Sequence, residues 1–230
     1  QIKTMSEFKF PTEEVELPSK GLIYSKDNPL SSGKVEMKYM TAREEDILSN
    51  QSYIQKGTVL DKLLDSLIID KNINADDLIV GDKNALLIAS RILGYGKDYE
   101  VKIKGESYTI DCSTLENKKF DESKFEAGKN EFSYTLPSTD NVITYKLITG
   151  HDEKAINREI AGLKRLQKDA SPELSTRLKH IILSVDGKEE KKDIRDFVDN
   201  YFLARDSRAF RDHIKNPQPD VNLSHILDNG

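Results

Sequence analysis

The chain has 230 residues, of which 37% are hydrophobic and 33% are charged. This composition is that of a folded protein with a small core and a heavily charged surface, and it excludes an intrinsically disordered chain. Its 40 acidic and 35 basic side chains give a net charge of −5, which argues against broad nucleic-acid binding because that needs a basic surface.

Neither a membrane span nor a secretion signal is visible in the sequence. No apolar run approaches the roughly 20 residues that cross a bilayer, and Gln1 to Thr4 do not begin a signal peptide. The single cysteine, Cys112, excludes an internal disulfide and a cysteine-based zinc site within these residues. We interpret Cys112 as a small buried side chain and expect a soluble protein made in a reducing cytoplasm.

The first forty residues predict two strands. Residues 13–17 and 34–40 alternate apolar and polar side chains, so the apolar positions of each share one face of a strand. Pro18-Ser19-Lys20-Gly21 is a turn sequence, and residues 27–33 form a polar loop before the second strand.

Three helices are predicted to follow. Thr41-Ala42-Arg43-Glu44 is a capping box that opens a short helix, with Thr41 as the cap and Glu44 reaching back to it. Residues 58–70 carry an apolar stripe at helical spacing and form the strongest predicted helix of this half. Residues 84–93 predict a third helix, which we expect Gly94 to end.

A second β section is predicted between about residues 99 and 148. Residues 99–103 and 108–110 alternate on either side of a Lys-Gly-Glu-Ser turn, which indicates a hairpin. Residues 132–136 and 142–148 form a second predicted pair of strands. The charged residues 116–130 between these two pairs are expected to form a loop.

From Asp152 onward the pattern predicts helices only. Isoleucine and leucine recur every three or four residues after Asp152, Pro172 opens a second helix, and residues 194–202 carry the apolar stripe of a third. Asp206 is predicted to cap a last helix through Ile214.

These elements predict an α+β protein. Its N-terminal mixed part, residues 1–150, combines antiparallel strands with three helices, and its C-terminal helical part covers residues 151–230. The change from a mixed to a helical pattern near Gly150 marks the predicted domain boundary. The sequence contains no internal repeat.

The sequence predicts no catalytic residue, no cofactor-binding residue and no metal ligand. The four histidines, at positions 151, 180, 213 and 225, have no ligand spacing relative to one another. His151-Asp152-Glu153 could serve a hydrolase, but acidic residues at a helix start are explained by the helix dipole. Gly94-Tyr95-Gly96-Lys97 follows a predicted helix and precedes a strand, which is the reverse of a phosphate-binding loop. We therefore predict a protein that is not an enzyme.

Protein docking is the function that the residues favour instead. The basic residues between Lys154 and Lys168 lack interleaved aromatic side chains, so we interpret them as a solvated helix face and not as a nucleic-acid site. In the last helix Arg205, Arg208, Arg211 and Asp212 are either ordinary surface charges or a partner-binding surface. Arginine suits such a surface because it makes paired hydrogen bonds to carboxylates.

The order of several motifs resembles a family of T4-like contractile-tailed phage proteins, described as baseplate hub subunits or baseplate hub assembly proteins. The resemblance covers about residues 10–223. It is carried by Leu17-Pro18-Ser19-Lys20-Gly21-Leu22-Ile23-Tyr24, residues 35–46, Lys56-Gly57-Thr58-Val59-Leu60, residues 82–96, Ser184-Val185-Asp186-Gly187, residues 205–214 and Pro219-Asp220-Val221-Asn222-Leu223.

The resemblance implies a viral protein made in the host cytoplasm, with other baseplate or tail proteins as partners and no cofactor. It leaves open whether the protein stays in the virion or is a transient tail assembly chaperone, and it does not fix the oligomeric state. Some relatives are expected to bear paired cysteines near the equivalent of Lys104 to Cys112 and after the equivalent of Leu223. In the first of these regions residues 104–107 of this chain are Lys-Gly-Glu-Ser, so we expect no metal-stabilised hairpin there.

Overall fold

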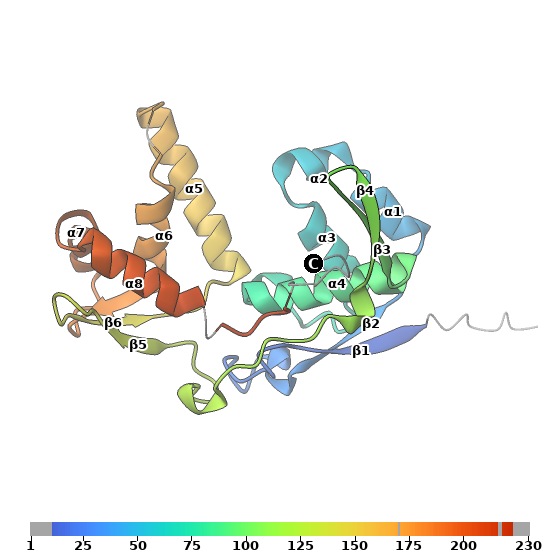
Figure 1. The fold of residues 1–230 in the computed structure, drawn as a ribbon, viewed down its shortest axis with the longest axis horizontal. Coiled ribbons are helices and arrows are strands. Elements are labelled where there is room, and N and C mark those ends of the chain that lie inside the picture. Colours follow the sequence, from blue (N-terminus) through green and yellow to red (C-terminus); the bar gives the residue numbers. More distant parts are fainter. Residues whose placement is uncertain (1–10, 170, 216–217, 223–230) are drawn as a thin grey trace, which may run out of the picture.

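The computed structural model describes residues 11–169, 171–215 and 218–222, which form eight α-helices and seven β-strands (Figure 1). The strands lie in three small antiparallel sheets, which confirms the predicted α+β class. Buried apolar side chains form two clusters, one in each half of the molecule. Within the described ranges, no helix is long and apolar enough to cross a bilayer.

The first cluster lies between a two-stranded sheet and the helices that follow it. Val15 pairs with Val35 across this sheet, and Val35 and Met37 are buried, as the alternating pattern predicts. Ile68, just after α3, forms a β-bridge to Met37. The elements are β1 Thr12–Glu16, η1 Pro29–Ser32, β2 Lys34–Lys38, α1 Ala42–Leu48, α2 Gln51–Lys56, α3 Val59–Leu67, η2 Ala75–Asp77 and α4 Val80–Tyr95.

Two helices of this half differ from the sequence prediction. The pattern does not predict α2, because none of its six residues is buried and it has no apolar stripe. Helix α4 begins before the predicted Asn84 and passes through Gly94, so the prediction that Gly94 ends it is wrong. A Cβ at Gly94 would lie 2.8 Å from Sδ of Met40, so the glycine allows close packing. The helix ends instead at Gly96, whose φ of 84° suits glycine.

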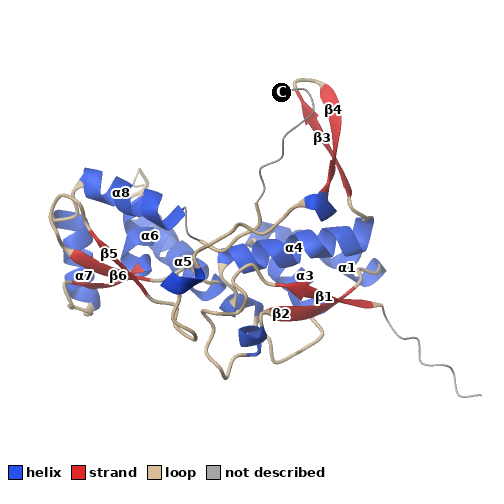
Figure 2. Cartoon of the chain, turned by 60° about the horizontal axis from the view of Figure 1, so that its bottom comes forward, coloured by secondary structure: helices blue, strands red, loops and turns tan. Residues whose placement is uncertain are grey.

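The predicted hairpin is confirmed as a two-stranded ribbon, β3 Asp98–Ile103 and β4 Glu106–Asp111, that projects from the body (Figure 2). Its turn places Lys104 and Gly105 at positive φ, as a tight hairpin turn requires. Tyr99 and Ile103 share one face of the ribbon and are nearly half exposed.

The second half is built on a three-stranded antiparallel sheet in the order β5-β6-β7. The pattern does not predict β7, because its short apolar run cannot be distinguished from a helix end by periodicity. Strand β7 pairs with β6, so this sheet contains residues from both sides of Gly150. The domain boundary near Gly150 stays a prediction. The elements are η3 Cys112–Thr114, η4 Glu122–Lys124, β5 Phe132–Thr135, β6 Val142–Tyr145, α5 Gly150–Leu166, α6 Glu173–Ile181, β7 Ile182–Val185, α7 Lys191–Asn200 and α8 Ala204–Lys215.

Several contacts join the halves, among them an aromatic one and one made by the chain after α8. The ring of Phe132 packs against both hydrophobic clusters, with its centroid 5.1 Å from that of Phe125 and 5.6 Å from that of Tyr145. After α8 the chain returns to α4 of the first half (Figure 1). There a Cβ at Gly81 would fall 1.8 Å from the carbonyl oxygen of Pro219, so only glycine fits.

Glu44 closes the predicted capping box and is fully buried. Its carboxylate accepts hydrogen bonds from Thr41 N at 2.8 Å and Ser66 Oγ at 2.6 Å, and forms an ion pair with Lys38 Nζ at 2.8 Å. Burial raises the pKa of Glu44, but the hydrogen bonds from Lys38, Ser66 and Thr41 outweigh it and lower the pKa to about 2.

Glu44→Gln is therefore expected to be destabilising in a pH-dependent way. A folded-state pKa below the ordinary 4.5 means that ionised Glu44 stabilises the fold above that pH, and that this stability is lost as the pH falls toward 2. We expect the variant to have a free energy of unfolding about 2 kcal/mol lower than that of the unchanged protein at pH 7, and the difference to become smaller below pH 4.5. Urea unfolding at a series of pH values measures it. Glu45→Gln, on the exposed side of the same helix, is the control and should leave stability unchanged within about 0.5 kcal/mol. If Glu44→Gln lowers the free energy of unfolding by the same amount at every pH, the lowered pKa of Glu44 is contradicted.

Candidate docking surface

One face of α8 is fixed to the second core. Phe210 is fully buried, with its ring centroid 5.2 Å from that of Tyr145 in an edge-on arrangement. Asp206 lies inside the helix, so the prediction that it caps α8 is wrong. Its buried carboxylate instead accepts hydrogen bonds from Ser138 N and Thr139 Oγ1, both at 3.0 Å, and thereby ties α8 to the turn between β5 and β6.

The opposite face of α8 carries the residues predicted to contact a partner. Arg205, Arg208, Arg211 and Asp212 are all exposed, and we call them the arginine face. Residues 205, 208 and 212 follow each other at spacings of three and four, so they line one side of the helix, with Arg211 beside them. Arg211 Nε donates to the carbonyl oxygen of Ser207 at 3.3 Å.

No ion pair forms on the arginine face within the part of the chain that the structure describes. The spacing allows Arg208 to pair with Asp212, but the two do not pair. An i, i+4 ion pair in a helix is weaker when the cation precedes the carboxylate in sequence than when it follows it, and here Arg208 precedes Asp212. Both side chains are therefore available to a partner.

Two other arginines are already paired within the protein. Arg195 donates to both carboxylate oxygens of Glu159, at 2.5 and 2.9 Å, and Arg177 donates to both of Glu153, at 2.7 and 3.2 Å. The hydrogen bond from Arg195 lowers the pKa of Glu159 to about 2. The arginine face presents the same fork-shaped donors without a carboxylate opposite them, so it can accept one from another protein.

The basic residues of α5, and Lys168 just after it, are only partly paired. Lys154 forms an ion pair with Asp76 at 2.6 Å, and Lys164 forms one with Glu173 at 2.7 Å. Arg158, Arg165 and Lys168 are exposed and have no ion pair among the described residues.

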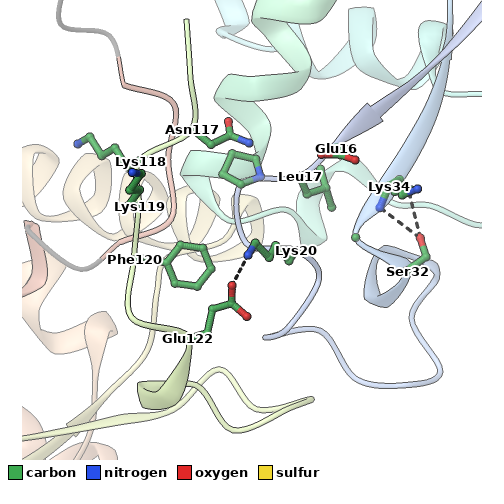
Figure 3. Close-up of a pocket in the computed structure, with 12 residues that line it drawn as sticks. Glu16, Leu17, Lys20, Ser32, Lys34, Asn117, Lys118, Lys119, Phe120 and Glu122 are labelled. Atoms are coloured by element: carbon green, nitrogen blue, oxygen red, sulfur yellow. Dashed lines mark hydrogen bonds and ion pairs between the residues drawn. The ribbon is translucent and has the colours of Figure 1, made fainter.

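A surface hollow of about 640 Å³ lies where the loop after β1 meets the segment after η3 (Figure 3). Lys20 reaches across it, paired with Glu122 and with its ammonium 5.9 Å from the ring centroid of Phe120. Lys20 has a φ of 55°, which costs a residue other than glycine about 1–2 kcal/mol. Half of the twelve lining residues are lysine or glutamate, whereas small-molecule pockets are lined mostly by apolar side chains. The hollow is therefore better explained as a solvated junction than as a ligand site.

Sequence reasoning did not find the buried carboxylate of Asp82. Asp82 is fully buried and accepts hydrogen bonds from Ser19 N at 2.9 Å, Ser19 Oγ at 2.5 Å and Tyr24 OH at 2.6 Å. Tyr24 OH in turn accepts one from Ile79 N at 3.1 Å. Burial raises the pKa of Asp82, and the hydrogen bonds from Ser19 and Tyr24 oppose it. The network attaches the loop after β1 to the first turn of α4, so its role is structural.

His151 lies in the first turn of α5, where Asp152 completes a capping box with Thr149. Its Nε2 is 2.7 Å from Oδ1 of Asp77, and the side chain is more than half exposed. Asp77 is its only side-chain partner among the residues described, so no serine, threonine or cysteine nucleophile is hydrogen-bonded to it there. The arrangement fixes α5 to η2, which is a structural role.

The remaining candidates for chemistry are isolated. Cys112 lies directly after β4 and has a free thiol; it is half-buried, not buried as the sequence predicts. His180 accompanies Arg195 on Glu159, and His213 stacks on Tyr134 at 4.2 Å between ring centroids. His225 lies outside the described residues. In the described ranges, no three His, Cys, Asp or Glu side chains are grouped to hold a metal.

Comparison of the chain with protein-family models, with curated proteins and with solved structures gave no match.

Proposed function

We propose that the chain is a non-enzymatic docking component of a phage contractile-tail baseplate hub, and that it binds its neighbour through the arginine face. The observation that carries this proposal is that Arg205, Arg208 and Arg211 are exposed and have no ion pair among the described residues, while Arg177 and Arg195 are paired with carboxylates inside the protein. The resemblance of the ordered sequence motifs supplies the tail assembly context.

The expected partner surface is acidic. Guanidinium groups bind carboxylates with two parallel hydrogen bonds, and exclusion of water at the contact strengthens them. Phe210 anchors the helix from behind, so the three arginines are held on a rigid element before the partner arrives. The protein would be made in the host cytoplasm and would meet other baseplate or tail proteins during assembly.

Charge reversal at Arg208 tests the docking surface. Arg208→Glu is expected to weaken association with the partner tail protein by about 2 kcal/mol, roughly 30-fold, because it places like charges opposite each other. The measurement is co-purification of the hub complex, followed by affinity titration with the partner so obtained. Arg165→Glu reverses another exposed arginine, on α5, and should leave association unchanged. Normal assembly with Arg208→Glu, in a protein that still folds, would refute the proposal.

Mass spectrometry of purified particles then distinguishes a permanent subunit from an assembly factor. A stoichiometric amount of the chain in the particles indicates a structural subunit. Its presence in assembly intermediates but not in particles indicates a tail assembly chaperone that leaves before the virion is complete.

A further inference from the structure

A cleft of about 760 Å³ separates the two halves of the molecule on a side that α8 does not line. In Figure 1 helix α5 rises on one side of it, α2 and α3 form the other side, and α4 crosses beneath. The cleft is therefore a trough between helices and is distinct from the arginine face.

The floor of the cleft is apolar and open to solvent. Leu60 of α3 is 43% exposed and Val80, the first residue of α4, is 42% exposed, although most large apolar side chains of this half are buried. Other apolar residues of these two helices belong to the first hydrophobic cluster, so the floor of the cleft is an exposed extension of that cluster. Leu87 of α4 also lines it, partly buried.

Each wall of the cleft carries a cation that has no ion pair among the described residues. Lys56 lies at the end of α2 on one wall, and Arg158 lies on α5 on the other. The acidic side chains of the lining are already engaged: Asp61 pairs with Lys83 at 2.6 Å, and Glu153 with Arg177. An apolar floor thus lies between two unneutralised positive charges.

We propose that this cleft binds an amphipathic helix of a partner protein whose apolar stripe is flanked by acidic residues. Apolar side chains spaced along one helix face would cover Leu60 and Val80, and carboxylates on both sides of that face would meet Lys56 and Arg158. Among the described residues no aromatic side chain lines the cleft, so these residues offer none of the stacking surfaces that single-stranded nucleic acids use. Because a bound helix would contact α3, α4 and α5 together, it would hold the two halves in one arrangement.

The probe is a synthetic helical peptide with leucine at every third or fourth position and glutamate on both flanks. Its twin has lysine in place of each glutamate. We expect the acidic peptide to bind the full chain with a dissociation constant of about 10 µM, and the basic twin to bind at least about tenfold more weakly, in fluorescence anisotropy. Equal binding of both peptides, or binding of neither, would overturn the proposal.

Matched variants localise the binding. Leu60→Ser and Arg158→Glu should each weaken the acidic peptide about tenfold. Ile54→Ser changes a residue of similar exposure, 46%, that does not line the cleft, and Arg165→Glu reverses a charge farther along α5; neither should alter the affinity. If the controls weaken binding as much as the cleft variants do, the proposal fails.

Sedimentation of the chain alone tests whether a second copy of the chain occupies the cleft instead. Self-association that Leu60→Ser abolishes would show that a second copy fills the cleft, and would likewise overturn the proposal. The arginine-face variant Arg208→Glu should bind the peptide normally, so failure of the cleft and failure of the proposed docking function are distinguishable.

Discussion

Replacing Asp82 with alanine is expected to lower the free energy of unfolding by about 3–5 kcal/mol, since it leaves several buried hydrogen-bond donors without their acceptor. The carboxylate is fully buried and accepts three hydrogen bonds from Ser19 and Tyr24. Alanine leaves the hydroxyl of Ser19 buried and without that acceptor, and it releases the loop after β1 from α4. A loss of this size is a large fraction of the stability of a typical domain.

Urea unfolding followed by circular dichroism measures this loss directly. Asp27→Ala removes an exposed carboxylate from the same half and should change stability by less than about 0.5 kcal/mol. If Asp82→Ala costs no more than this control, the network does not hold the loop as described.

The second large effect is expected at Phe210. Phe210→Ala should lower the free energy of unfolding by about 4 kcal/mol, because truncating a fully buried phenylalanine removes its contacts and leaves a cavity. The lost contacts include the rings of Tyr145, Tyr134 and Phe202, at centroid distances of 5.2, 5.9 and 6.1 Å. Since this side chain anchors α8, the variant should also weaken docking through the arginine face.

Thermal unfolding compares Phe210→Ala with Tyr201→Ala, which truncates a ring that is 63% exposed. The exposed position should cost less than about 1 kcal/mol. Equal losses at both positions would mean that Phe210 does not anchor the helix.

The sequence predicts elements well where one local signal defines them. The capping box at Thr41 predicts the start of α1, and the dense apolar stripe of residues 58–70 predicts α3. Where tertiary contacts decide, the prediction fails. The first turn of α4 contains Gly81, a poor helix former, which is needed there because Pro219 packs against it. Strand β7 becomes recognisable only through its pairing with β6.

The candidate site follows the same division. Helical periodicity places Arg205, Arg208 and Asp212 on one side of α8, so their exposure could be predicted from the sequence. The partners of Asp82 and Asp206 lie more than 50 residues away along the chain, and no spacing rule connects them. The sequence therefore predicts which charged side chains of α8 are exposed, but not which carboxylates are buried.

The proposal that α8 contacts a baseplate or tail protein is tested most directly by site-specific cross-linking. A photo-crosslinking amino acid is placed at position 208 in one version of the protein, and at position 26, an exposed loop position, in another. Tail assembly intermediates containing each version are illuminated and analysed by mass spectrometry. The proposed function predicts a cross-link from position 208 to a baseplate or tail protein and none from position 26. An intermediate that contains the chain but yields no cross-link from position 208 would contradict it.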